Sequence, residues 1–374
     1  MMRVVPRNAF SPELCGILIE ANENENCVYL TATNPECSIQ RRVMLHVECG
    51  GSFVMDARFM REILSKLGGE EVTFCEVKER IVEIRSGSCT YTVPVLEGRV
   101  YPRPQMPFPK DTLAVRGLGK LYGCIAAVAL NNEKESVLCG IHMEITPKTV
   151  KMMACNRVGF AIAAQKMDTG GKLSFTLPKT ALLCLVSAIG DDDILEVGIV
   201  GRDVVFMKET LLFSVRFLHH EYVDVNRLLQ YVQPICTAKL EYDGLKRKLL
   251  DICDIAMLGK EKSYVRITFK ENVLEAATEN DFGSSCAEIS CVRLEGEGKY
   301  TYYYQAQQLK DLLKCFASAV MLRLDKRGYL VAFDRSNQYV ITPLTKEAVY
   351  RQQQKVAAIR MKQQTNTLKE KNAA

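Results

Sequence analysis

The chain has 374 residues, a net charge of +5 and 48% hydrophobic residues, an ordinary composition for a globular protein. Its apolar runs are all shorter than the roughly 18 residues of a transmembrane helix, and its N-terminal segment lacks the apolar core of a signal peptide. We therefore expect a cytoplasmic protein whose fifteen scattered cysteines stay free. The length suits two or three domains.

The positive charge lies at the C-terminus. Residues 346–374 contain seven lysines and arginines and two glutamates, so this segment carries +5 and the rest of the chain is neutral. A neutral body with a basic tail differs from the uniformly basic composition of many nucleic-acid-binding proteins.

The sequence repeats itself at the scale of a domain. Leu-Cys-Gly-Ile begins at Leu14 and again at Leu138, 124 positions later. Strand-like runs ending in Ala-x-Asn follow at 32–34 and 154–156, with a third version at 277–279. Segments in which a strand leads into a helix begin at Phe53, Phe175 and Tyr302, with spacings of 122 and 127. Such a period exceeds the roughly 20–50 residues of solenoid repeats, so the sequence indicates three consecutive copies of one domain.

The first repeat contains alternating apolar and polar segments that predict strands at 28–33, 38–48, 72–74, 81–85 and 88–95. Between them, residues 56–67 predict an amphipathic helix with Phe59, Ile63 and Leu67 on its apolar side. Four prolines within 101–110 mark the end of this repeat.

The second repeat begins with a strand and a helix within residues 115–130 and has an almost wholly apolar helix at 179–189. The third has helices at 242–258 and 306–316 and closes with a strand at 339–343. We therefore predict an α+β fold with domains at 1–108, 109–234 and 235–345, the first lacking its opening strand and most of its first helix. The Gln/Lys-rich tail, 346–374, has few apolar residues and reads as a disordered or solvated helical tail, with disorder as the expected state.

The sequence offers no recognisable catalytic motif, since the patterns GxxxxGK[ST], HExxH and GxSxG are all missing. Asp191, Asp192 and Asp193 are consecutive and read as a solvated turn rather than a metal site. We expect a protein that is not an enzyme and has no cofactor or metal. An enzyme with an unrecognised site stays open as an alternative.

The predicted helices share one weak signal. Residues 56–68, 111–131, 178–190, 242–260 and 305–317 each carry a net charge of +1, which leaves −5 for the remainder of the body. Equivalent basic helices suggest a common surface for phosphate groups, which requires no base-reading residues.

The order of these motifs resembles the bacterial DNA sliding clamp, the β subunit of DNA polymerase III, over about residues 3–345. The likeness rests on LCGI, LTATNPECSI, FVMDARFMREILSKLGGEEV and VLEGRVYP in the first repeat, on their counterparts in the second, and on the closing YVITPL. The resemblance implies two chains of three sliding-clamp domains each, with helices lining a ring and antiparallel sheets outside. It implies a processivity factor that encircles duplex DNA without sequence preference, near the nucleoid. Its partners would be replicative DNA polymerase, the clamp loader and other proteins with a clamp-binding motif.

The resemblance also assigns sites. The basic residues outside the apolar stripes should face DNA: Arg58, Arg61, Arg116, Lys120, Lys179, Lys246, Arg247, Lys310 and Lys314. The homodimer interface would place Tyr91 and Val93 of one chain against Met257 and Leu258 of the other. A pocket for Gln-Leu-x-Leu-Phe-like peptides would be formed by Cys155, Arg157, Val158, Gly159, Phe160, Leu229, Gln230, Ile235, Val340, Thr342, Pro343 and Leu344.

The chain departs from the family at this pocket, where residues 155–160 read Cys-Asn-Arg-Val-Gly-Phe instead of Thr-Asp-Gly-His-Arg-Leu. A different peptide motif is one consequence. The tail starts beside Leu344 and could cover the pocket or reach DNA. Val349, Val356 and Ile359 fall at near-helical spacing, which would let a short helix lie over the pocket. The alternative to a ring is a clamp-fold binding module that does not close and acts by binding polymerase or clamp-loader components.

Overall fold

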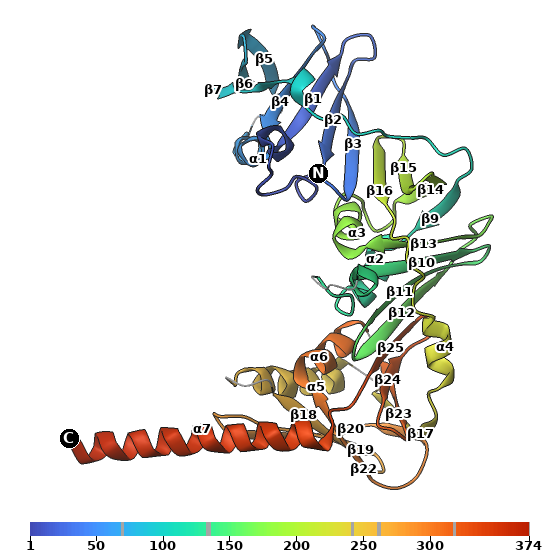
Figure 1. Ribbon diagram of the computed structural model, residues 1–374, viewed down its shortest axis with the longest axis vertical. Helices are drawn as coiled ribbons and strands as arrows, with labels where there is room; N and C mark the ends of the chain where they lie inside the picture. The colour runs from blue at the N-terminus through green and yellow to red at the C-terminus, as the bar shows by residue number, and fades with distance from the viewer. Residues whose placement is uncertain (69–70, 132–135, 241–242, 260–262, 317–318, 374) are drawn as a thin grey trace. The chain divides into compact units, whose positions relative to one another are not determined.

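The computed structural model describes residues 1–374 except 69–70, 132–135, 241–242, 260–262, 317–318 and 374. The chain, whose helices and strands are labelled in Figure 1, divides into two compact units. Unit 1 contains residues 1–120, 143–150 and 166–219, and unit 2 contains 121–142, 151–165 and 220–374.

Unit 1 is built on a nine-stranded sheet with the strand order β8-β4-β1-β2-β3-β16-β15-β14-β9, in which all neighbours are antiparallel. A second sheet has the order β5-β6-β7. The strands are β1 Gly16–Asn22, β2 Cys27–Thr33, β3 Cys37–Met44, β4 Gly51–Asp56, β5 Thr73–Lys78, β6 Ile81–Ser86, β7 Cys89–Pro94, β8 Leu96–Glu97, β9 Leu113–Arg116, β13 Leu173–Pro178, β14 Ile194–Val200, β15 Asp203–Lys208 and β16 Leu211–Arg216. The helices are η1 Pro12–Cys15, α1 Ala57–Leu64, η2 Gly98–Val100 and α3 Lys179–Val186.

Unit 2 has strands in the order β12-β25-β24-β23-β17-β21 and a four-stranded sheet in the order β20-β19-β18-β22. The strands are β12 Gly159–Lys166, β17 Pro234–Leu240, β18 Tyr264–Phe269, β19 Val273–Glu279, β20 Ser284–Ser290, β21 Val292–Glu295, β22 Tyr300–Gln305, β23 Val320–Asp325, β24 Leu330–Phe333 and β25 Asn337–Ile341. Its helices are η3 Ser136–Cys139, α4 Val225–Gln230, α5 Asp243–Met257, α6 Ala306–Lys314 and α7 Lys346–Ala373. The elements α2 (Leu118–Ile125), β10 (Gly140–Thr146) and β11 (Thr149–Asn156) have residues in both units, and the last residue of β12, Lys166, belongs to unit 1.

A strand that runs directly into a helix occurs three times. Strands β4, β13 and β22 have six residues each and are followed at once by α1, α3 and α6. The last strand residue has nearly the same backbone each time: φ −53°, ψ 125° at Asp56; −56°, 134° at Pro178; and −63°, 128° at Gln305. Phe53, Phe175 and Tyr302 are each the third residue of the strand. The sequence repeat therefore corresponds to a structural one.

An asparagine-centred turn also recurs. The side-chain carbonyls of Asn34, Asn156 and Asn280 accept backbone N–H groups two or three residues later, at 2.9–3.2 Å. Their amide groups donate to the carbonyl oxygens of Val4, Val128 and Ile255, at 2.8, 3.0 and 2.8 Å. The third repeat is thus aligned at Asn280, and the sequence-based alignment of Glu279 with Asn34 and Asn156 is wrong by one residue.

The N-terminal segment of unit 1 differs from the start of the second repeat. Residues 1–11 contain no strand or helix, and only η1 precedes β1, whereas β9, α2 and η3 precede β10. The carbonyl of Val4 in this segment accepts the Asn34 amide, as Ile255 near the end of α5 does for Asn280. The N-terminal segment thus takes over one hydrogen bond that a helix makes elsewhere.

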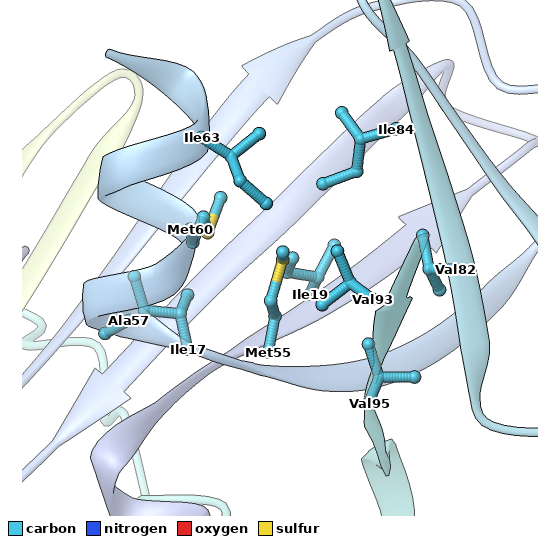
Figure 2. Packing of buried hydrophobic residues seen from close by; sticks show 10 residues of the cluster. All are labelled: Ile17, Ile19, Met55, Ala57, Met60, Ile63, Val82, Ile84, Val93 and Val95. Atoms are coloured by element: carbon cyan, nitrogen blue, oxygen red, sulfur yellow. The ribbon is translucent and has the colours of Figure 1, made fainter. Parts of the chain in front are cut away.

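The helix α1 covers a core in unit 1 that β1, β4, β6 and β7 complete (Figure 2). Ala57, Met60 and Ile63 form its buried side, while Phe59 is 46% exposed, so the predicted stripe of Phe59, Ile63 and Leu67 is wrong in Phe59. The helix also ends at Leu64, before the predicted residue 67. Likewise, α3 ends at Val186 instead of 189, and α6 at Lys314 instead of 316. Residue 242, the predicted start of α5, lies outside the described residues.

The C-terminal tail is helical, which contradicts the prediction of disorder. Its helix α7 spans Lys346–Ala373. The exposed fractions of Val349 and Val356 are only 5% and 7%, and Gln353 between them donates a hydrogen bond to the Tyr264 hydroxyl of β18. Two buried valines seven residues apart give α7 a tertiary contact that the composition alone does not reveal.

The asparagine turns generate a prediction about stability. We expect Asn280→Ala to lower the free energy of unfolding by about 1–3 kcal/mol, because the change removes three hydrogen bonds, one to the Ile255 carbonyl and two from the backbone N–H groups of Phe282 and Gly283. Urea unfolding measures the effect, with exposed Asn24→Ala as the control. Equal urea midpoints for the two variants would contradict the proposed contribution of this turn to stability.

Candidate functional site

Unit 2 contains an apolar cluster that unites several residues of the predicted peptide pocket. Cys155, Phe160 and Val340 are buried in it, and Leu229 of α4 packs against them partly exposed. The other members are Leu138, Met153, Ile162, Val225 and Val331, with Leu130, Tyr222, Val232, Tyr329 and Phe333 at the edge. Cys155, Phe160 and Val340 thus form the floor of the cluster. Phe160 and Val340, which the resemblance assigns to the peptide pocket, are buried and present little surface to a peptide.

The strands β12 and β25 meet unusually closely at Gly159. A Cβ atom at this position would lie 2.4 Å from the carbonyl oxygen of Val340, so only glycine fits. Next to it, the backbone N–H and the hydroxyl of Thr342 both donate to the carbonyl of Val158, at 3.0 and 3.1 Å. The Val-Gly-Phe segment that departs from the family pattern is therefore what joins these strands.

A buried carboxylate holds the segment after α4 in place. Asp325 is fully buried and accepts the backbone N–H groups of Gln233 and Arg327, both at 2.6 Å. The Arg327 guanidinium lies 3.3 Å from the same carboxylate, stacks 4.5 Å from the centre of the Tyr329 ring and donates to the Tyr231 carbonyl. This network links the end of α4 to the β23–β24 turn and so positions Leu229 over the cluster.

Tyr222 supports the floor from the other side. Its hydroxyl accepts the backbone N–H of Cys155 at 2.9 Å, and its ring stacks on His142 with centroids 5.2 Å apart. Burial raises the pKa of this hydroxyl well above its usual value, so Tyr222 stays neutral. Sequence reasoning missed Tyr222, Asp325, Arg327 and Tyr329. An aspartate that ends an apolar strand before a Lys-Arg-Gly turn was the one available signal.

The remaining predicted pocket residues lie at the surface of unit 2 or leave the cluster. Arg157, Val158 and Gln230 are exposed, and Ile235 in β17 is half-buried. After Thr342, the chain passes through Pro343 and Leu344, both half-buried. The N–H of Leu344 bonds to the Tyr303 carbonyl in β22 at 2.7 Å, and α7 begins two residues later.

The predicted DNA-facing residues of unit 1 are mostly exposed. Arg58, Arg61, Arg116 and Lys120 are exposed and Lys179 is half-buried. The Arg58 guanidinium donates to the carbonyl of Arg7. Lys120 makes a loose ion pair, 3.9 Å from the carboxylate of Asp192.

In unit 2, Lys246 contradicts the prediction that it faces DNA. Its side chain is 9% exposed, and the ammonium donates to the Phe316 carbonyl at 2.5 Å, just beyond the end of α6. A cation there stabilises the carbonyl end of the helix. Arg247 and Lys314 are exposed, and Lys310 forms an ion pair with Asp254 of α5.

The predicted interface residues differ in accessibility. Leu258, just after α5, is 70% exposed, while Met257 and Tyr91 are half-buried. Val93 is only 2% exposed and points into the core beneath α1 (Figure 2). Its side chain is therefore not free to meet a second chain, and the assignment of Val93 is wrong in that respect.

Among the described residues, no group of three or more His, Cys, Asp or Glu side chains could hold a metal ion. Asp191–Asp193 form a turn, in which Asp193 pairs with Lys208 at 2.5 Å. No helix in the described part of the chain is long and apolar enough to cross a membrane.

The Asp325 network leads to a second prediction. Asp325→Ala should lower the free energy of unfolding by about 1.5–3 kcal/mol, because charged hydrogen bonds to Gln233 and Arg327 are lost from a buried position. Asp192→Ala, at a fully exposed carboxylate, should change it by less than about 0.5 kcal/mol. Similar urea midpoints for both variants would argue against the network.

Comparison with known proteins identifies the relatives of the chain. Residues 1–107 match the family model of the DNA polymerase III beta subunit, N-terminal domain. The beta sliding clamp of Lactococcus lactis is 22% identical over 318 residues, which cover 81% of this chain and 82% of the relative. The beta sliding clamp of Staphylococcus aureus is 23% identical over 325 residues, covering 83% and 84%.

Solved structures share the fold over nearly the whole chain. The DNA polymerase III beta chain of Streptococcus pneumoniae has a TM-score of 0.82 at 20% identity, covering 92% of this chain and 95% of that one. The DNA polymerase sliding clamp of Bacillus subtilis has a TM-score of 0.80 at 20% identity, covering 92% and 94%. The chain is therefore a divergent relative of the bacterial DNA sliding clamps and has their fold.

Proposed function

We propose that this protein is a DNA sliding clamp, a processivity factor that encircles duplex DNA as a two-chain ring and tethers replicative DNA polymerase, the clamp loader and other partners. The sliding-clamp fold over 92% of the chain, at a TM-score of 0.82, is the observation that carries the proposal. A closed ring is linked to DNA topologically, so its contacts with phosphates can be weak and independent of sequence. Such a protein is not an enzyme, and it acts in the cytoplasm at the nucleoid.

Three domains per chain fit this function. We assign them to residues 1–108, 109–234 and 235–345, each with its own strand–helix junction at α1, α3 or α6. We propose that the helices line the ring and face DNA through long, exposed cations. These are Arg58, Arg61, Arg116, Lys120, Arg247 and Lys314, with Lys179 and Lys310 less exposed.

We propose that the ring closes head to tail through two sheet edges. Tyr91 lies in β7, an edge of the sheet β5-β6-β7. The helix α5 ends at Met257 and packs on β20, an edge of the sheet β20-β19-β18-β22. Pairing β7 with the partner's β20 satisfies both open backbone edges, and Leu258 becomes covered. Val93 contributes its backbone to this strand pair.

We propose that partner peptides dock on the apolar cluster of unit 2. Leu229 and Val158 present apolar surface above a floor of Phe160 and Val340, and the Asp325 network fixes this arrangement. A short peptide with two or three large apolar side chains suits such a surface. Arg157 and Val158 replace the family residues here, so the preferred motif differs from that of other clamps.

The proposed function is tested by topological retention on DNA. The protein is threaded onto linear duplex whose ends are then blocked by bound streptavidin, and the DNA is washed with concentrated salt. A ring stays bound through the wash and is released when a restriction enzyme cuts the DNA, because salt weakens phosphate contacts but not a topological link. Release by salt alone would refute ring closure and favour the open binding module.

The matched control is Met257→Asp combined with Leu258→Asp. Two covered apolar side chains contribute about 1.5–3 kcal/mol each, so the double variant should dimerise at least about 100-fold more weakly and lose retention. Leu294→Asp, at a 52% exposed leucine of β21, should remain dimeric and be retained. Sedimentation velocity measures the dimer, and a dimeric double variant would place the interface elsewhere.

Peptide docking is tested at Leu229. Leu229→Asp should weaken binding of a fluorescent Gln-Leu-x-Leu-Phe peptide at least tenfold, because a carboxylate would face the apolar side chains of the peptide. Fluorescence anisotropy measures the affinity, and Leu294→Asp again serves as the control. If both variants bind as tightly as the unchanged protein, the apolar cluster is not the docking site.

A further inference from the structure

The helix α7 crosses the four-stranded sheet of unit 2 in a defined direction. The chain leaves β25 and passes β22, where the N–H of Leu344 bonds to the Tyr303 carbonyl, just before α7 begins. The Gln353 amide then donates to the hydroxyl of Tyr264, the first residue of β18, at 3.1 Å. Further along, the Arg360 guanidinium bonds to Glu279 at 2.7 Å and to the Asn280 carbonyl, at the end of β19. The helix thus passes β22, β18 and β19 and heads for the edge strand β20.

The face of the sheet that α7 covers is opposite to α5 and α6. Val265 and Ile267 are buried under α5 and α6, which pack on β18. Side chains alternate along a strand, so Tyr264 and Arg266 point to the other face. Arg266 lies opposite Ala277 in the ladder, and Glu279 shares the face of Ala277. The residues that hold α7, Tyr264 and Glu279, therefore both belong to the outer face.

The first half of α7 is anchored there. Val349 and Val356 are buried, and Tyr264 is only 5% exposed although it lies on the outer face. Neither Tyr264 nor Glu279 belongs to the apolar cluster that we propose as the peptide site. The anchored half therefore does not cover that cluster, contrary to one of the possibilities that the sequence suggested.

The second half of α7 is longer than the sheet beneath it. Thirteen residues, 361–373, follow Arg360 in the helix, and at a rise of about 1.5 Å per residue they span about 20 Å. Only β20 remains to be crossed, a step of about 5 Å. The helix therefore extends about 15 Å beyond the sheet edge, a width of about three strands. Figure 1 shows this end of α7 projecting past strands β18–β20 of unit 2.

We propose that the C-terminal part of α7 is a strap that lies across the ring interface, on the outer face of the partner chain's sheet β5-β6-β7. This inference rests on the proposed two-chain ring, in which β20 pairs with the partner's β7. The joined sheet then continues from β20 into three further strands of the partner, which is the width that the end of α7 spans.

Charge complementarity supports this occupant. Residues 361–374 contain Lys362, Lys369 and Lys371 against one acid, Glu370, a net charge of +2. Residues 71–94, which include the strands β5, β6 and β7, contain four glutamates against Lys78, Arg80 and Arg85, a net charge of −1. Glu83 forms an ion pair with Arg85, and all of β5 is exposed. DNA is a less suitable occupant, since the anchored half lies on the face opposite to α5 and α6, whose cations we assign to DNA.

The test places a photocrosslinker in the full-length chain. With p-benzoylphenylalanine at position 367, irradiation of the dimer should give an intermolecular crosslink, which mass spectrometry should map to residues 71–94 of the partner. The same group at Gln354, an exposed position on the anchored half, should give no crosslink to that segment. A dimer retained on DNA that lacks the crosslink from position 367 overturns the strap and leaves the proposed function intact.

A charge-reversal pair provides the second readout. Lys369→Glu with Lys371→Glu should raise the dissociation constant of the dimer about tenfold, as measured by sedimentation at dilution, whereas Lys346→Glu at the exposed start of α7 should leave it unchanged. An unchanged dissociation constant with weaker binding to DNA would assign the end of α7 to DNA and overturn the strap. A full-length chain that is monomeric and not retained on DNA would overturn both proposals.

Discussion

The arrangement of each repeat depends on a hydrogen bond from an asparagine side chain to a carbonyl outside its own hairpin. Asn34, Asn156 and Asn280 each shape a tight turn with their carbonyl oxygen and use the amide to hold a neighbouring segment. The same side chain therefore fixes two things at once, the turn and the position of the segment packed beside it. Because buried amides are costly when unpaired, this residue tolerates little change. That constraint persists even in unit 1, where an irregular N-terminal segment supplies the carbonyl of Val4.

The sequence period was enough to predict the strand–helix junctions, because an apolar strand that ends at a helix start leaves a strong local pattern. It was less informative about short helices. In α1, only eight residues are helical, so Ile63 fits both the predicted stripe with Phe59 and the observed one with Met60. Two helical turns contain too few positions to distinguish the predicted apolar stripe from the observed one. The helix ends were overestimated for a related reason, since apolar residues continue into the turns that follow.

Side chains whose surroundings come from distant segments could not be predicted. Lys246 has the sequence context of an exposed helix residue, yet it caps the carbonyl of Phe316, seventy positions away. Val93 was assigned by resemblance to an interface, but its strand faces α1 on that side. The network of Asp325, Gln233 and Arg327 spans more than ninety residues, and its one local sign is the aspartate that ends an apolar strand before a Lys-Arg-Gly turn. The tail shows the same effect, because Val349 and Val356 have a partner surface only once β18 and β19 are in place.

The two faces of the sheet β20-β19-β18-β22 have different uses. One face is covered by α5 and α6, which bury Leu249, Ile252 and Leu309 against it. Arg247 and Lys314 of these helices stay exposed. The other face is polar and pleated, with ion pairs such as Arg266–Glu275 at 2.8 Å, and an antiparallel sheet can leave such a face in water. A helix laid on that face adds contacts without disturbing the basic surface. The helix α7 therefore leaves the surface that we assign to DNA uncovered. Its C-terminal part extends beyond β20, where we propose that it contacts the partner chain.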